Sequence, residues 1–194
     1  MKRAILIVTV LFIAVISTAC INNFAVQELN NKAKVYLENG DYDAAINRLQ
    51  SSIDLDSTIF ETHYNLGVAY IKNKQYKKAI EALSKALDLN PEYADSYYSL
   101  AVAQESYAQE LLDANSETST VTSEDNDDVE DVKVDEDIKK MSVEQRKLTA
   151  IELYTNAVAS YKKYLLKSND AKDSEDINNQ IKSIEEELSK LGNE

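Results

Sequence analysis

Two side chains in this sequence offer reactive chemistry that no other residue duplicates: one thiol and one imidazole. Cys20 is the only cysteine, so no disulfide can form within the chain. His63 is the only histidine, which excludes a two-histidine metal site and a histidine-based nucleophile relay. None of the three glycines has a second glycine nearby, so a phosphate-binding loop is also absent. We therefore expect no catalytic residue, no metal site, no cofactor and no small-molecule substrate.

The thiol of Cys20 ends an apolar N-terminal segment. Lys2 and Arg3 precede an apolar stretch over Ala4–Ile16, and small residues follow it up to the cysteine. This arrangement resembles a bacterial lipoprotein signal peptide, although Ser17 stands where leucine is most usual. The resemblance implies acylation of the Cys20 thiol by fatty acids such as palmitate. It also implies that residues 1–19 are removed and that residues 20–24 form the acylated N-terminus and a short linker.

The alternative interpretation of this segment is an uncleaved membrane anchor. Ala4–Ala19 has 16 residues, about 24 Å of helix at about 1.5 Å per residue, against a hydrocarbon core of about 30 Å. The short span favours the lipoprotein. The resemblance then implies a lipid anchor on the extracytoplasmic side of the bacterial cell envelope. Because Ile21 rather than aspartate follows the cysteine, it implies the periplasmic face of the outer membrane if the cell has two membranes.

The net charge argues against a nucleic-acid partner. Lys and Arg number 21 against 34 Asp and Glu, which gives a formal charge of −13. Such an acidic chain repels nucleic acid and anionic headgroups. Because glycine occurs three times and proline once, the composition favours long helices with few tight turns.

One stretch, Phe60–Pro91, has small and large apolar residues at the spacing that packs two antiparallel helices. Gly67 and Ala79 are small where the helices must approach, and Leu83 is large beside them. The spacing resembles the tetratricopeptide repeat (TPR) pattern, with His63 at its aromatic position, where we expect it to pack rather than react. A copy displaced by 34 residues precedes this stretch. The repeat-core positions are Ala33, Tyr36, Ala45, Leu49, Leu66, Gly67, Tyr70, Ala79, Leu83, Ala86, Pro91, Ala157 and Tyr161.

The resemblance implies an all-α fold, namely a TPR-type helical-hairpin solenoid with an extended third hairpin and a C-terminal capping helix. The third repeat is interrupted, because its second helix is displaced by 44 residues beyond the normal period. The predicted boundaries are a TPR domain over 25–169, with repeats at about 26–59, 60–93 and 94–169, an acidic disordered insertion over 113–141, and a capping helix over 174–192.

Local signals predict where several helices begin and end. We expect Gly40 to end the first helix, Asp41 to cap the second, and Gly192 to close the last. Capping boxes are expected at Thr58-x-x-Glu61 and Ser142-x-x-Gln145. The pair Asn90-Pro91 should cap the first helix of the third repeat, with the proline at its first helical position, and Ser174 should cap the last helix.

The acidic insertion is the most strongly charged part of the chain. Asp113–Asp137 holds eleven acidic residues and one base, Lys133, so it cannot bury a core and is expected to be a solvated loop. A calcium site is disfavoured because the loop lacks the turn glycine of an EF-hand. Attraction of a basic partner stays open.

In TPR proteins the first helix of each repeat lines a concave groove, which implies a protein or peptide partner. The partner should be membrane-associated because the lipid anchor is close. The segment that docks should be apolar or aromatic, with a basic residue near Glu105. We expect a scaffold or adaptor rather than an enzyme, and the alternative is a structural subunit of an envelope assembly complex. The groove residues are Asn30, Lys34, Leu37, Tyr64, Val68, Ile71, Tyr98, Val102 and Glu105.

Overall fold

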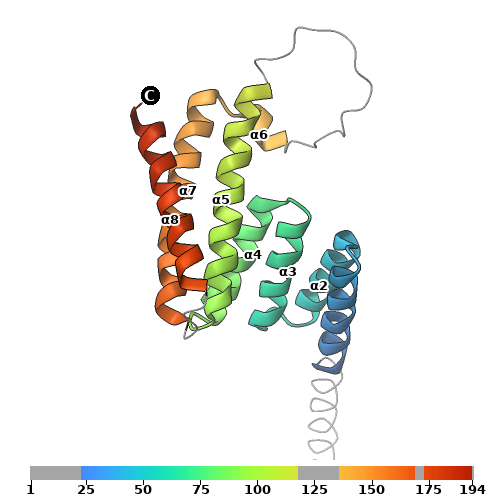
Figure 1. Ribbon diagram of the computed structural model, residues 1–194. Helices are drawn as coiled ribbons and strands as arrows, with labels where there is room; N and C mark the ends of the chain where they lie inside the picture. The colour runs from blue at the N-terminus through green and yellow to red at the C-terminus, as the bar shows by residue number, and fades with distance from the viewer. Residues whose placement is uncertain (1–22, 118–135, 169–172, 194) are drawn as a thin grey trace, which may run out of the picture. The chain divides into compact units, whose positions relative to one another are not determined.

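The computed structural model describes residues 23–117, 136–168 and 173–193 (Figure 1). Over these ranges the chain forms α-helices and no β-strand, as the sequence predicted. The described residues divide into two compact units, unit 1 within Met1–Pro91 and unit 2 within Glu92–Glu194. Both consist of α-helices, as expected of a chain in which glycine and proline are scarce.

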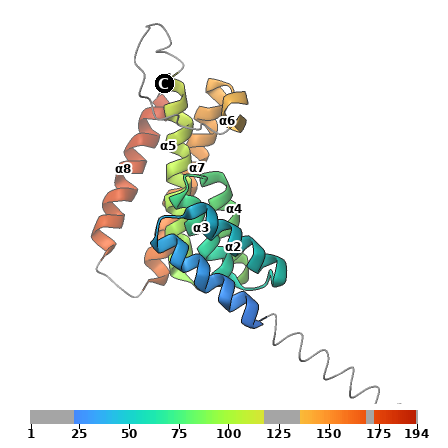
Figure 2. The ribbon, with the colours of Figure 1, turned by 90° about the vertical axis from the view of Figure 1, so that its right-hand side faces the viewer.

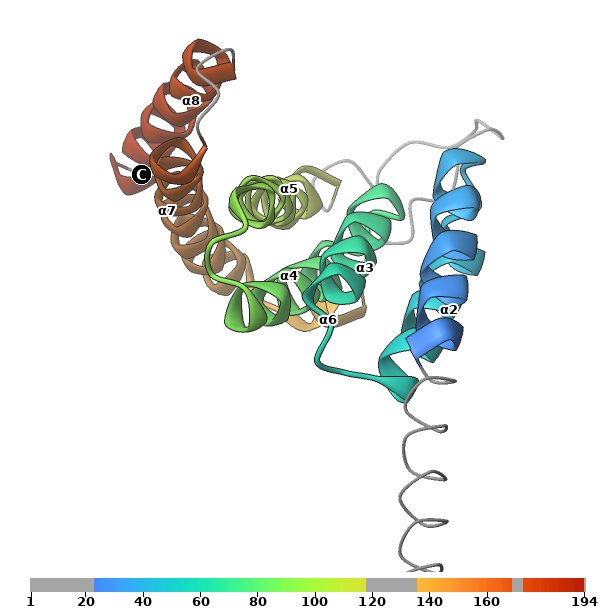
Figure 3. The same ribbon diagram turned by 90° about the horizontal axis from the view of Figure 1, so that it is seen from below.

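Unit 1 contains two helical hairpins. α2 packs against α3, and α3 packs against α4 (Figure 3). The first hairpin turns at Gly40, whose φ of 77° lies in the left-handed region that glycine adopts at low cost. Asp41 caps the next helix as predicted, because its Oδ1 accepts a bond of 3.1 Å from the Ala44 N–H. The helices of unit 1 are residues 23–38, α2 (Tyr42–Leu55), α3 (Phe60–Lys72) and α4 (Tyr76–Leu89).

Close approach of α3 and α4 explains the small residues of the repeat. A Cβ atom added at Gly67 would overlap the Leu83 side chain, so only glycine lets the helices lie at this distance. Ala79 and Leu83 are both fully buried beside it. Apolar residues also fill the space between the other helices of unit 1, because Ala33, Ala45 and Leu49 are buried in the same way.

Unit 2 is built on one long hairpin of α5 and α7, with α8 packed against α7 in the opposite direction (Figure 2). Ser142 begins α7 with the predicted capping box: its Oγ accepts from Gln145 N at 3.2 Å, and Gln145 Oε1 accepts from Ser142 N at 2.9 Å. The extended third hairpin and the C-terminal helix are therefore as expected. The helices of unit 2 are α5 (Ala94–Glu117), α6 (Glu136–Lys140), α7 (Val143–Lys167) and α8 (Ser174–Asn193).

Two predicted helix starts are wrong. Thr58 does not cap α3, whose N-cap residue is Ile59, because the Thr58 N–H and hydroxyl both donate to Asp56 Oδ1, at 2.9 and 2.6 Å. An aspartate two residues earlier offers a tighter local turn than the capping box does. Pro91 is not at the first position of a helix, since α5 begins at Ala94. The proline is exposed in the preceding turn, so it is not a core position either.

The end of the chain and the insertion also need correction. α8 continues through Gly192 to Asn193, so this glycine does not close the helix. The predicted insertion over 113–141 is too wide, because α5 extends to Glu117 and α6 begins at Glu136. Ile138 of α6 is fully buried, and apolar burial of this kind is what an acidic loop was expected to lack. Residues 118–135, which hold most of the predicted loop, lie outside the described residues.

No helix in the described part of the chain combines the length and the apolar character needed to cross a bilayer. Across residues 23–117, 136–168 and 173–193, no group of three or more His, Cys, Asp or Glu is placed to hold a metal ion.

Candidate partner-binding surface

The predicted groove residues of unit 1 lie on two helices and differ in exposure. On the helix over residues 23–38, Lys34 is exposed and Leu37 is partly exposed. On α3, three residues are partly exposed although Leu66, Ala69 and Tyr70 between them are buried. Helical spacing produces this alternation, because residues three and four apart share a face. These three predicted groove residues of α3 are Tyr64, Val68 and Ile71.

Asn30 has an internal role that the sequence did not reveal. Its Nδ2 lies 2.8 Å from Ser52 Oγ of α2 and 3.0 Å from Thr62 Oγ1 of α3, and both of these hydroxyl residues are fully buried. The amide therefore ties the helix over residues 23–38 to the two helices that follow. Buried hydroxyls need such partners, since leaving them unpaired costs about 1–3 kcal/mol. Of the predicted groove residues, Asn30 is the one committed to holding unit 1 together.

In unit 2, Tyr98 of α5 is the aromatic side chain most open to solvent, with 43% of its surface exposed. Its ring packs on two tyrosines of α7: Tyr161 at 5.9 Å between centroids in an edge-to-face arrangement, and Tyr164 at 5.4 Å. Edge-to-face pairs gain from the ring quadrupoles beyond the area they bury. Tyr98 is therefore a rigid, half-open aromatic surface rather than a loose side chain. Val102, one turn further along α5, is partly exposed.

Glu105 is also less available than the sequence suggested. Its Oε2 accepts a hydrogen bond of 2.9 Å from the Tyr161 hydroxyl, and its Oε1 accepts one from the Gln180 side chain of α8. Both oxygens are thus engaged by other helices of unit 2. The expectation that a basic partner residue pairs with Glu105 is not supported, because the carboxylate already has charge-assisted bonds within the unit.

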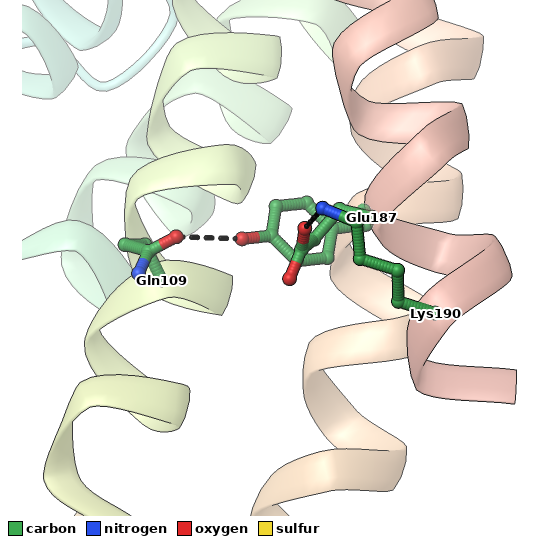
Figure 4. Close-up of polar contacts among 4 residues, drawn as sticks. Gln109, Glu187 and Lys190 are labelled. Atoms are coloured by element: carbon green, nitrogen blue, oxygen red, sulfur yellow. Dashed lines mark hydrogen bonds and ion pairs between the residues drawn. The ribbon is translucent and has the colours of Figure 1, made fainter. Parts of the chain in front are cut away.

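Burial and nearby carboxylates raise the pKa values of two tyrosines of α7. Burial, followed by the charge of Glu105, holds the pKa of Tyr161 well above its ordinary value. Burial, followed by the charges of Glu187, Glu105 and Asp113, raises the pKa of Tyr154 to about 12. The Tyr154 hydroxyl donates to Gln109 Oε1 of α5 at 2.9 Å, and Glu187 lies on the neighbouring α8, where Lys190 pairs with it at 2.9 Å (Figure 4). Both phenols stay neutral donors at physiological pH.

The single histidine lies within the described residues, and the single cysteine does not. His63 is buried, and its Nε2 lies 2.9 Å from the Ser57 carbonyl oxygen. That bond anchors the turn before α3 and suits the packing role expected of this position. Cys20 lies outside the described residues, so acylation of its thiol stays a prediction.

The sequence did not predict one buried polar pair, Gln104 and Ser160. Ser160 Oγ donates to Gln104 Oε1 at 3.0 Å, and both residues are buried in the α5–α7 hairpin. Their separation of 56 positions crosses the insertion, so no periodic signal could have paired them. The only hint was a glutamine within the apolar stripe that contains Leu100, Tyr107 and Leu111.

Comparison with known proteins supports the repeat interpretation. The tetratricopeptide repeat family matches residues 60–93, and a second TPR repeat family matches residues 33–74. These residues therefore contain tetratricopeptide repeats, in the stretch whose small residues first suggested them. A search of curated protein sequences gave no significant match.

Solved structures show the same fold. A structure described as the first TPR of Spaghetti (RPAP3) bound to HSP90 peptide SRMEEVD is 18% identical, with a TM-score of 0.56, covering 84% of this chain and 93% of that one. The Arabidopsis OM64 TPR domain is 12% identical, with a TM-score of 0.58, covering 84% and 98%. The TPR2B–pHsp70 complex of yeast Sti1 is 14% identical, with a TM-score of 0.53 and the same coverage. The fold class of this chain is thus the all-α TPR helical-hairpin solenoid.

Proposed function

We propose that this chain is a lipid-anchored TPR scaffold of the bacterial cell envelope that binds a protein or peptide partner. The observation that carries the proposal is that each unit exposes apolar and aromatic residues on a helix whose neighbouring positions are buried. Tyr64, Val68 and Ile71 are partly exposed on α3 of unit 1, and Tyr98 and Val102 are open to solvent on α5 of unit 2. Solvent-facing tyrosines held by packing are frequent anchors of interfaces.

The similar structures support a protein-interaction role without identifying a partner. One of them is described as bound to an HSP90 peptide, and another is described as a complex with pHsp70. Those complexes concern other proteins, and identities of 18% and 14% support the shared fold alone. The partner proposed for this chain is instead an apolar or aromatic segment of a membrane-associated protein. A partner that relies on basic residues to reach Glu105 is excluded from the proposal, since that carboxylate is already bonded within unit 2.

In this proposal, the lipid anchor at Cys20 determines where the protein is located in the cell. The predicted linker over residues 20–24 reaches at most about 17 Å when fully extended, so it would keep the acylated residue close to the TPR domain. Unit 1 would then be held close to the lipid surface. Partners embedded in that membrane, or being assembled there, would meet the scaffold at high effective concentration.

Metabolic labelling with a fatty acid tests the anchor. Cys20→Ser removes the proposed acylation site, so the variant should accumulate as an unprocessed precursor without labelled lipid. Ser17→Ala is the matched control, because it changes another residue of the same segment and keeps the thiol. If Cys20→Ser is labelled and processed as well as the unmodified chain, the lipoprotein proposal fails.

Crosslinking in the cell followed by purification tests the scaffold itself. A scaffold should yield a partner whose recovery depends on Tyr64 and Tyr98, the tyrosines of the predicted groove, which we call the inner-face tyrosines. The amount of that partner should be below one copy per chain. A structural subunit, the alternative, should instead copurify with fixed partners in a constant ratio that ignores those tyrosines.

A further inference from the structure

The turn between α3 and α4 carries a concentrated positive charge that the proposed function does not use. Four of its seven residues over 72–78 are lysines, and all four are exposed. We call this set the lysine tip. These four lysines are half of the eight Lys and Arg residues in 20–91, a range that also holds nine Asp and Glu. The lysine tip consists of Lys72, Lys74, Lys77 and Lys78.

The backbone of the lysine tip is held rigidly. Asn73 N donates to Ala69 O at 3.0 Å, Lys74 N to Ile71 O at 3.0 Å, and Gln75 N to Tyr70 O at 2.9 Å. The Lys78 Nζ donates to Gln75 Oε1 at 2.9 Å and lies 5.8 Å from the centre of the Tyr70 ring. These contacts of Lys78 are with a neutral amide and an aromatic ring, so they orient its ammonium group without cancelling its charge.

Lys74 occupies a backbone position that favours glycine. Its φ of 56° is in the left-handed region, and the corresponding residue of the preceding repeat is Gly40, with φ of 77°. A side chain at such a φ is strained, and strain of this kind gathers at functional positions because the surrounding structure must sustain it. The chain thus keeps a lysine here at a cost to its own stability.

The corresponding turn of the first repeat has the opposite charge. Glu38 and Asp43 stand 34 residues before Lys72 and Lys77. The two turns touch, since Asn73 Nδ2 donates to Asp43 Oδ1 at 2.9 Å. A turn between the two helices of a repeat therefore does not require lysines, because the corresponding turn of the first repeat forms with acidic residues.

The position of the lysine tip in unit 1 helps to distinguish between the possible anionic partners. The helix over residues 23–38 runs from the anchor side toward these turns, a length of 16 residues, or about 24 Å at about 1.5 Å per residue. The α3–α4 turn lies at the end of unit 1 opposite the start of that helix (Figure 1). If the anchor is as proposed, the chain would attach to the membrane at the end of unit 1 opposite the lysine tip, a separation larger than the screening length of about 8 Å in physiological salt. A long polyanion such as nucleic acid would also meet the acidic excess of the whole chain.

From these observations we propose that the lysine tip docks a carboxylate-rich segment of a partner protein. A short acidic segment needs only the local field of four ammonium groups, whose flexible stems and rigid backbone let several of them reach neighbouring carboxylates. Binding depends on salt, since exposed charge pairs are screened. The lysine tip is thus a second contact surface, independent of the inner-face tyrosines.

Fluorescence anisotropy with a labelled Glu-rich peptide tests this proposal, using the full chain in neutral detergent at low and at physiological salt. Replacing the whole tip with K72Q, K74G, K77Q and K78Q should weaken binding by about tenfold or more. The single variant Lys74→Gly should weaken binding severalfold while raising the thermal midpoint, because it removes a charge and relieves backbone strain. Lys85→Gln, an exposed lysine further along α4, should change neither.

Because Lys74→Gly should lower the affinity while raising the thermal midpoint, unfolding cannot be the cause of its weaker binding. Equal affinity of the chain for the matching Gln-rich peptide, or unchanged binding by the four-residue variant, overturns the proposal. So does an unmodified chain that does not bind the Glu-rich peptide at low salt. Tip-dependent binding to phosphatidylglycerol vesicles or to a short DNA duplex, stronger than to the peptide, would assign the lysine tip to a membrane or to nucleic acid instead.

Discussion

The α3–α4 hairpin of unit 1 and the α5–α7 hairpin of unit 2 hold two antiparallel helices together by different means. In α3–α4 the close contact is steric, with Gly67 and Ala79 small and Leu83 filling the space. In α5–α7 a row of polar pairs, which we call the polar row, runs along the interface. It consists of Gln104–Ser160, Glu105–Tyr161 and Gln109–Tyr154, of which Gln104–Ser160 is the most buried. Shape complementarity is enough for helices of 13 and 14 residues. The longer helices, of 24 and 25 residues, add bonds that form only in one register.

This difference shows how a repeat tolerates an insertion. A short turn fixes the register of α3 and α4, since only residues 73–75 separate them. The α5–α7 hairpin has no short turn, and its register depends on the helices themselves. Buried polar pairs suit that role because each misalignment would leave a donor or an acceptor unpaired. The polar row thus replaces the turn as the feature that selects the pairing.

The largest expected effect is in the steric hairpin. Ala79→Phe places a ring where the alanine is fully buried against α3, so the helices must separate or distort. We expect the free energy of unfolding to fall by about 3 kcal/mol, at the upper end of the usual cost of overpacking. Urea denaturation followed by circular dichroism measures it. Lys85→Ala on the exposed face of the same helix is the control. An unchanged midpoint for Ala79→Phe would show that α3 and α4 do not pack closely here.

The next effect concerns the polar row. Gln104→Ala leaves the buried Ser160 hydroxyl without its partner, and we expect a loss of about 2 kcal/mol. Combining it with Ser160→Ala should recover part of that loss, because no unpaired group remains. A double-mutant cycle therefore gives a positive coupling energy. Additive losses would mean that this pair does not act as a unit and that the register is selected elsewhere.

A smaller effect appears in the pH dependence of unit 2. Because the pKa of Tyr154 is raised to about 12, against about 10 in the unfolded chain, the folded state favours the neutral phenol. Its contribution is complete below pH of about 10 and is lost as the pH rises from about 10 to about 12. Tyr154→Phe should lower the free energy of unfolding by about 1 kcal/mol at neutral pH, through the lost bond to Gln109.

The same variant should flatten the alkaline fall in stability. Denaturation series between pH 9 and pH 12, compared with the unmodified chain, isolate the Tyr154 contribution because every other tyrosine and lysine titrates in both proteins. An identical pH slope for the variant would contradict the raised pKa and the burial that causes it.

The sequence predicted residue positions correctly where a close contact between two helices allows only a small or only a large side chain. Gly67, Ala79 and Leu83 were identified correctly because repeat packing dictates small and large residues at set intervals. The fold class followed from that spacing. Helix ends were harder: Thr58 could pair with Glu61 or with Asp56, and local geometry chose the aspartate. Gly192 lacks a positive φ, and a helix can continue through glycine at a modest cost.

The candidate surface was only partly predictable for a different reason. Tyr98 and Tyr64 were placed on their helices by the repeat register. The bonds that occupy Glu105 come from Tyr161 and from Gln180, which are 56 and 75 positions away along the chain. No pattern in one sequence gives such long-range pairings. The same applies to Asn30, whose partners lie on two later helices.

The most direct test of the scaffold is partner recovery by inner-face variants. Crosslinked complexes are purified through this chain, and the partner is quantified by mass spectrometry for Tyr64→Ala, Tyr98→Ala and the control Lys85→Ala. Each tyrosine variant should weaken the complex by about 1–3 kcal/mol, as loss of an interface anchor does, while its thermal midpoint falls little because both rings are partly exposed. The control should recover the partner fully. If both tyrosine variants recover the partner as well as the unmodified chain does, the inner faces are not the binding surface and the structural-subunit alternative takes their place.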